Sequence, residues 1–121
     1  MFSGGNVALM VEDVDRSVRF YTEALGLRLV GRDGVHGAEV EAAGLTLRLH
    51  RRRPEVTEAG SGTAAIGLQV GDVRASAAAL AGRGVRVGRV LDTGSGSMAL
   101  FEDPDGNHLY LFERRAAPEV R

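Results

Sequence analysis

Histidine, carboxylate and arginine side chains are the groups in this sequence that could carry chemistry. The histidines and the carboxylates in segments of strand character are His36, His50, His108, Glu39, Glu41, Glu102 and Glu113. An imidazole paired with a carboxylate can move protons or hold a divalent metal. Arg48 offers a permanently charged planar fork that suits a carboxylate, a phosphate or a phenolate. Acid–base catalysis, metal chemistry and anion binding are therefore all open.

Several other chemistries are excluded by composition. The chain has no cysteine, which excludes disulfides and thiolate catalysis and fits a reducing compartment. A net charge of −1 argues against a general binder of nucleic acid or membrane surfaces. No apolar run approaches the roughly 18 residues of a membrane span, and the first residues lack the pattern of a secretory signal. We therefore expect a cytoplasmic protein that binds neither nucleic acid nor membranes.

An internal repeat positions these groups. The stretches "LMVEDVDRS" from Leu9 and "LQVGDVRAS" from Leu68 share five identities at equivalent places. In each copy an alternating strand runs into an aspartate, Asp13 or Asp72, which can cap a following helix. The first helix is predicted to stop at Gly26, and the second to run from Val73 to about Ala81. Each copy continues with three strand-like segments, so the unit is βαβββ, twice.

The strands and turns follow from period-two alternation and turn residues. The predicted strands are residues 6–11, 27–31, 37–42, 45–51, 65–70, 85–91, 98–102 and 107–114. The predicted turns are Asp33-Gly34, Ala43-Gly44 and Asp103-Pro104-Asp105-Gly106, the last with aspartates bonded to local amides. We expect one domain, residues 1–121, made of two modules at about 5–53 and 63–114. A polar linker at about 54–62 joins them.

Alternation also predicts two different faces on each sheet. One face is aliphatic and belongs against the helices. The other mixes small, aromatic and hydrogen-bonding groups, as a ligand pocket does. Its candidate ligand-binding residues are Asn6, Ala8, Met10, Arg48, His50, Ala65, Gly67, Gln69, His108, Tyr110 and Phe112. Small residues opposite Tyr110 and Phe112 would leave room for a flat molecule, and Arg48 would need Glu39, Glu41 or a ligand anion as its partner.

Two stretches carry a resemblance to a known family. They are "VALMVEDVDRSVRFYTEALGL" at residues 7–27 and "FEDPDGNHLYLFE" at residues 101–113. The chain resembles the vicinal oxygen chelate superfamily, which holds glyoxalase-type lyases, extradiol dioxygenases, fosfomycin resistance proteins and bleomycin-binding proteins. The resemblance implies an α+β fold, in which two βαβββ modules form a curved, cupped, mixed eight-strand sheet. The helices would lie outside and the ligand or metal inside.

The resemblance also implies where a metal would be held. The family's usual ligand positions correspond here to Asn6, Arg48, Ala65 and Tyr110. An amide, a cation, a methyl group and a phenol are a poor set for a divalent metal. We therefore expect no metal, no cofactor and no catalytic residue. The favoured function is binding or sequestering a small organic molecule, aromatic or anionic, as a homodimer of the drug-binding, antibiotic-resistance type.

Three alternatives stay open. The first is a metal-free isomerase, cyclase or lyase that uses His50 or His108 as general base, with Arg48 stabilising an oxyanion. The second is a metal-dependent lyase or dioxygenase with displaced ligands. The third is an interaction or regulatory domain without a small-molecule role.

Overall fold

The computed structural model describes residues 1, 3, 5–52, 64–93 and 96–114, and these divide into two units. Unit 1 comprises Met1–Thr63 together with Asp103–Asn107, and unit 2 comprises Ala64–Glu102 together with His108–Arg121. The predicted linker at about 54–62 lies outside the described residues. Within those residues, no helix is long and apolar enough to cross a membrane.

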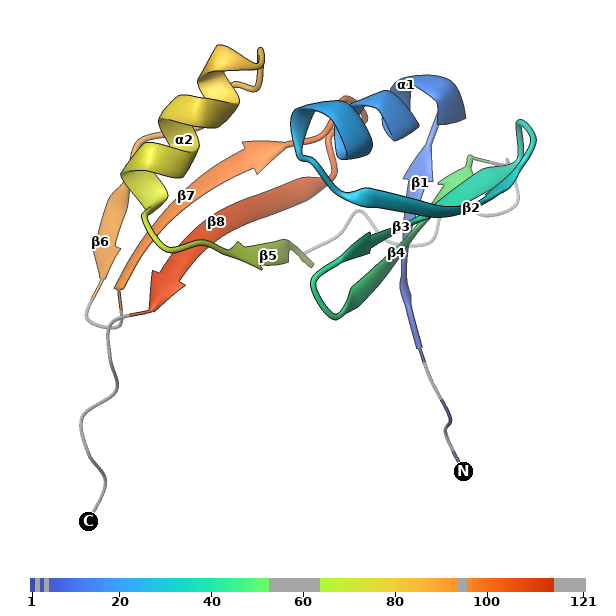
Figure 1. Cartoon of the computed structure of the whole chain (residues 1–121), viewed down its shortest axis with the longest axis horizontal. Helices are drawn as coiled ribbons and strands as arrows, with labels where there is room; N and C mark the ends of the chain where they lie inside the picture. The colour runs from blue at the N-terminus through green and yellow to red at the C-terminus, as the bar shows by residue number, and fades with distance from the viewer. Residues whose placement is uncertain (2, 4, 53–63, 94–95, 115–121) are drawn as a thin grey trace. The chain divides into compact units, whose positions relative to one another are not determined.

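Unit 1 is built on a four-stranded sheet (Figure 1). Its elements are β1 (Val7–Val11), α1 (Val14–Arg19), the π-helical turn η1 (Phe20–Ala24), β2 (Arg28–Asp33), β3 (Gly37–Ala42) and β4 (Leu45–Arg51). The strand order is β1-β4-β3-β2, with β1 parallel to β4 and the other pairs antiparallel. The β3–β4 hairpin turns at Ala43 and Gly44, whose φ angles of 39° and 91° suit a tight two-residue turn.

Unit 2 repeats this plan. Its elements are β5 (Ile66–Gln69), α2 (Val73–Gly82), β6 (Leu91–Thr93), β7 (Gly96–Glu102) and β8 (His108–Arg114). The strand order is β5-β8-β7-β6; among the described residues β5 pairs in parallel with β8, and the pairs β8–β7 and β7–β6 are antiparallel. The predicted α+β class and the two βαβββ modules are therefore confirmed.

Both helices begin where the sequence predicts. The Asp13 carboxylate accepts a hydrogen bond from Arg16 N at 3.1 Å, and Asp72 accepts one from Ala75 N at 3.1 Å. At α2 the Glu113 carboxylate of β8 also accepts from Val73 N at 2.8 Å. A negative group at this end satisfies a free amide and complements the helix dipole.

The end of the first helix differs from the prediction. The helical pattern up to Gly26 predicts one continuous amphipathic helix, but α1 ends at Arg19 and the chain continues as the wider turn η1. The Thr22 hydroxyl donates to Val18 O at 2.7 Å. In an α-helix the Thr22 amide would donate to that carbonyl, so the hydroxyl competes with the helical bond and favours the wider turn. Gly26 does end the segment, with φ 74°.

The prediction of a strand at 85–91 is mostly wrong. Only Leu91 of that range lies in β6, and before it Val87 makes one isolated bridge to Phe101. Gly88 N also donates to Leu100 O at 2.8 Å. The glycines that flank Val85 and Val87 weaken a regular strand, because they add backbone freedom and no packing. The other strands agree with their predicted bounds to within two residues.

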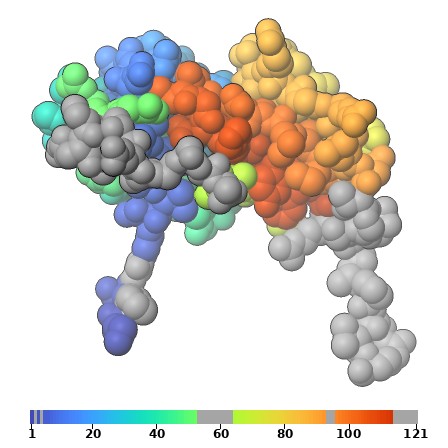
Figure 2. All heavy atoms as spheres, turned by 180° about the vertical axis from the view of Figure 1, so that it is seen from behind, coloured from blue at the N-terminus to red at the C-terminus, as the bar shows by residue number. Residues whose placement is uncertain are grey.

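The helix-facing sides of the sheets form the core, as predicted. In unit 1, α1 packs on β3 and β4, and in unit 2, α2 packs on β7 and β8. The buried aliphatic residues of the strands include Val11, Val40, Leu47, Leu49, Ile66, Leu109 and Leu111. Val7 is an exception, because it is 37% exposed near the start of the chain. Atoms of β7 and β8, orange to red in Figure 2, reach the surface on the side seen there.

Candidate functional site

The open side of the unit 2 sheet carries a group of mainly apolar residues. Directly opposite residues carry their side chains on the same side of a sheet. Tyr110 pairs with Gly67 on β5 and Leu100 on β7, and Phe112 pairs with Gln69 and Met98. We call this set the aromatic face: Gly67, Gln69, Leu91, Met98, Leu100, Tyr110 and Phe112. Leu100 is 51% exposed, so the face presents apolar surface to its surroundings.

The two rings of the aromatic face lie together. The ring centroids of Tyr110 and Phe112 are 5.7 Å apart, with an interplanar angle of 42°. Both side chains are half-buried. Such a tilted pair offers the flat apolar surface and ring edges on which another aromatic group can pack.

The Tyr110 ring also covers Gly67. A Cβ atom built on Gly67 would lie 2.5 Å from Cζ of Tyr110 and 2.6 Å from its Oη. The expectation that small residues leave a flat space opposite Tyr110 is therefore wrong at Gly67, because the phenol itself occupies that space. Ala65 lies before β5 and Asn6 before β1, so neither takes part in the strand pairing predicted for it. The open apolar surface lies on the β7 side instead, at Leu100.

The open side of the unit 1 sheet is charged. We call its side chains the charged face: Ala8, Met10, Arg28, Glu39, Glu41, Thr46, Arg48 and His50. Nη1 of Arg48 lies 2.9 Å from Oε1 of Glu39, and Nη2 of Arg28 lies 3.0 Å from Oε1 of Glu41. Of the partners considered for Arg48, the structure therefore selects Glu39. A ligand anion at the Arg48 guanidinium would therefore have to compete with the Glu39 carboxylate.

The histidines are placed as their alternation predicts. His50 lies opposite Met10 and Gly37 on the charged face, and His36 is exposed. His108 lies on the open side of the unit 2 sheet, with Nδ1 3.6 Å from Oε2 of Glu102, and both side chains are more than half exposed. At that separation and exposure the pair is a weak surface contact.

A metal does not fit the family's usual positions. Arg48 is ion-paired, the Tyr110 phenol lies against Gly67, and Asn6 and Ala65 are exposed residues that precede their strands. Among the residues that the structure describes, no three histidine, aspartate or glutamate side chains form a group that could hold a metal ion. These donors offer no set of the imidazole and carboxylate type that first-row metals bind.

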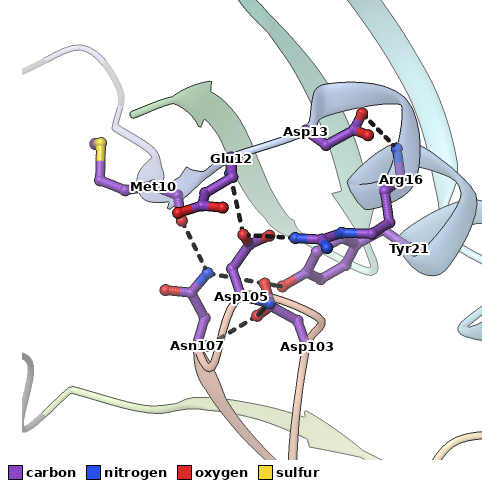
Figure 3. A network of polar contacts seen from close by, with 8 residues as sticks. All are labelled: Met10, Glu12, Asp13, Arg16, Tyr21, Asp103, Asp105 and Asn107. Carbon is purple, nitrogen blue, oxygen red and sulfur yellow. Dashed lines mark hydrogen bonds and ion pairs between the residues drawn. The ribbon is translucent and has the colours of Figure 1, made fainter. Parts of the chain in front are cut away.

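A polar network in unit 1 surrounds the turn at Asp103–Asn107 (Figure 3). We call it the turn network: Met10, Glu12, Arg16, Tyr21, Asp103, Asp105 and Asn107. Oδ1 of Asp103 accepts hydrogen bonds from the amides of Asp105 and Asn107 at 2.9 and 2.8 Å. This confirms the predicted turn. The other carboxylate oxygen of Asp103, Oδ2, accepts hydrogen bonds from the Tyr21 hydroxyl and the Asn107 side-chain amide, each at 2.8 Å.

Asp105 and Asn107 bond the same turn to β1 and α1. Oδ1 of Asp105 accepts from Glu12 N at 3.0 Å and from Nη2 of Arg16 at 2.9 Å. The Asn107 side chain donates to Met10 O at 3.2 Å. The Asp105 side chain is only 2% exposed, so its ion pair with Arg16 is better shielded than the pairs of the charged face. The turn is thus held by both aspartates and by the asparagine.

Tyr21 is the buried donor of the turn network. It is fully buried, and its ring packs edge-on to Phe20 at 5.2 Å between centroids. Burial raises the pKa of Tyr21 far above its ordinary value, and the negative charge of Asp103 raises it further. The phenol therefore stays neutral and donates to Asp103.

Sequence reasoning missed this network, although the repeat contains a signal for it. The residues that stand where Arg16 and Tyr21 do in the first copy are Ala75 and Leu80 in the second. Polar residues thus replace apolar ones at two helix positions of one copy only. The partners in the turn are far away in sequence, so the break in the repeat does not by itself reveal them.

These two-faced βαβββ sheets define the class of protein. The family model of the Glyoxalase/Bleomycin resistance protein/Dioxygenase superfamily matches residues 5–111, and the chain belongs to this family. The resemblance to the vicinal oxygen chelate superfamily is thereby confirmed. The fold serves several chemistries in this family, so it does not select one of them.

The chain is similar to TnmS3 from Streptomyces sp. CB03234, described as an antibiotic binding protein. The two are 30% identical, the match covers 95% of this chain and 99% of the other, and the TM-score is 0.74. It shares the fold of the bleomycin-binding protein from Streptomyces verticillus at 20% identity, with 95% and 98% covered and a TM-score of 0.71. A probable chloroplastic lactoylglutathione lyase of Arabidopsis thaliana is 28% identical over 94% of this chain. The chain spans only 36% of that relative's length.

Proposed function

We propose that the protein binds and sequesters a flat, largely apolar organic molecule on the aromatic face, without a metal and without a covalent step. The observation that carries this proposal is the half-exposed Leu100 beside the Tyr110–Phe112 ring pair. Apolar surface of this kind gains free energy when a ligand removes it from water. Tilted rings add directional contacts to a flat ligand.

The similarity to an antibiotic binding protein supports a resistance-type role. On this proposal the bound molecule is a drug-like aromatic compound, held by contacts that need no turnover. The remaining predicted residues of the sheet, Gln69 and His108, would bond polar groups at its edges. The charged face is proposed separately as a site for polar or anionic groups, with Arg48, His50, Met10 and Ala8 as its residues and Asn6 beside them.

At the charged face an anion must compete with Glu39. Replacing Glu39 by glutamine is expected to strengthen binding of an aromatic anion such as 2-naphthoate about threefold to fivefold, because a partly exposed ion pair contributes roughly 1 kcal/mol at most. Titration calorimetry would measure the change. Glu41→Gln removes the equivalent partner of Arg28 and is the matched control. Equal effects of both variants, or none with Glu39→Gln, would remove Arg48 as an anion site.

Two leucine variants test the aromatic face. Leu100→Ala is expected to weaken binding of the fluorescent probe 8-anilinonaphthalene-1-sulfonate about tenfold, since it deletes roughly 1.4 kcal/mol of apolar contact. Leu29→Ala on β2 removes a leucine of similar exposure, 42%, and is expected to leave the affinity unchanged. Equal losses in both variants would show that the probe binds exposed apolar surface in general, and the proposal would fail.

The proposal extends to the organisation of the chain. We propose a single ligand-binding domain that works as a cytoplasmic homodimer, in keeping with the absence of cysteine. Native mass spectrometry of the protein from its own source would report the number of subunits, any retained metal and the mass of any retained small molecule. A stoichiometric divalent metal would favour the metal-dependent alternative, and a retained organic molecule would favour the sequestering one.

A further inference from the structure

On the aromatic face, the Tyr110 ring lies close against the backbone of Gly67. The two residues are directly opposite on the parallel pair β5–β8. A Cβ atom on Gly67 would lie 2.5, 2.6 and 2.9 Å from Cζ, Oη and Cε2 of Tyr110, distances that no real Cβ tolerates. The phenol therefore leans over the backbone of β5, in a position that only glycine permits.

This lean has an effect on the other side of the ring. Leu100 is the neighbour of Tyr110 on β7, on the side away from Gly67. The phenol lies against Gly67 of β5, and Leu100 is 51% exposed. An aromatic side chain directly opposite a leucine would otherwise be expected to cover it.

We propose that Gly67 is a specificity-determining position. Because it has no side chain, it lets the Tyr110 ring lie over β5, and the Leu100 side of the aromatic face therefore stays open to a flat ring system. The inference rests on the proposed function and names the ligand class more closely. A flat fused-ring compound fits this surface, because it can lie on Leu100 with its edge against Tyr110 and Phe112.

A methyl group at position 67 would move the ring. The atoms it meets are the far end of the Tyr110 side chain, which can turn aside about χ1 without a shift of the backbone. Leu100 lies opposite Tyr110 on β7 and is 51% exposed, so we expect the ring to turn over Leu100. We therefore expect Gly67→Ala to keep the fold and to close the open part of the face.

The test compares Gly67→Ala with Gly71→Ala, a glycine that has nothing within 4 Å of its Cβ position. Gly67→Ala is expected to weaken binding of 8-anilinonaphthalene-1-sulfonate about tenfold, with an unchanged melting temperature, and Gly71→Ala to bind like the wild type. In the wild type, NMR should show Gly67 Hα close to the Tyr110 ring protons and shifted upfield by the ring current. Both signals should be lost in Gly67→Ala.

A double-mutant cycle with Tyr110→Ala isolates the proposed route. If Gly67 acts through the ring, Gly67→Ala has no further effect on probe affinity once the ring is absent. A tenfold loss that persists in the Tyr110→Ala background, or a wild type without the NMR contact, would overturn the inference. A wild type that shows the contact but does not bind the probe would refute the proposed function, while Gly67 would still be established as the residue that positions Tyr110.

Discussion

Replacing Asp103 by alanine is expected to lower the free energy of unfolding by about 3 kcal/mol or more, the largest effect of any single substitution considered for this protein. Asp103 is 5% exposed, and its carboxylate accepts four hydrogen bonds, from the amides of Asp105 and Asn107, the Asn107 side chain and the Tyr21 hydroxyl. Alanine would leave the Tyr21 hydroxyl buried without its acceptor, and an orphaned buried donor costs more than the lost bond. Urea denaturation followed by circular dichroism would measure the change.

The matched control for this prediction is Asp15→Ala. Asp15 also pairs with an arginine, Arg32, but its side chain is 65% exposed. Surface ion pairs contribute little, so the loss should stay below about 0.5 kcal/mol. If Asp103→Ala were no more destabilising than Asp15→Ala, the turn network would not be a significant source of stability.

The stability of the protein is expected to fall steeply in alkaline solution because of Tyr21. Burial raises the pKa of this phenol in the folded state, so above about pH 10 the unfolded chain loses a proton that the folded chain keeps. The contribution is fully present below about pH 10 and is lost above it, by up to about 1.4 kcal/mol for each further pH unit. Urea denaturation between about pH 9 and about pH 11.5 would show the slope.

The composition makes this alkaline test clean. The chain contains no lysine and no cysteine, and arginine keeps its charge throughout this range. Tyr21→Phe retains every other titrating group and should be less stable than the wild type near neutral pH by about 1.5–3 kcal/mol, the usual loss of a bond to a charged acceptor. Its stability should fall less steeply with pH, so that the two curves converge. If the stability of the wild type and of Tyr21→Phe fell in parallel with pH, Tyr21 would ionise in the folded protein as it does in the unfolded chain, and the prediction would be wrong.

Much of the fold could be predicted because local rules and the repeat agree. The capping aspartates Asp13 and Asp72, the glycine stop at Gly26 and the hairpin at Ala43-Gly44 all act within a few residues of chain. The prediction fails where a local pattern competes with another contact. At η1 the Thr22 hydroxyl donates a hydrogen bond to the Val18 carbonyl, which a regular helix would use for a backbone bond. At residues 85–90 glycines interrupt a run that otherwise has strand character.

The site could be predicted only in part. Alternation assigns Arg48, His50, Tyr110 and Phe112 to the open sides of the sheets, since period-two geometry fixes which way a side chain points. Alternation does not determine which rotamer a side chain adopts. The sequence therefore does not predict that Tyr110 lies over Gly67 or that Arg48 pairs with Glu39; both contacts follow from the structure. Whether the predicted residues bind a ligand stays a prediction.

The two-sided sheets have a consequence for how such a protein can change over generations. Residues that face the helices, such as Leu47 and Leu109, carry the packing, whereas Leu100 and Gln69 contribute little to it. Substitutions at exposed positions usually alter stability by less than about 0.5 kcal/mol. Exposed positions on the open sides of the sheets can therefore accumulate substitutions while the packing beneath the helices stays intact, so the surface of this architecture can diverge faster than its scaffold.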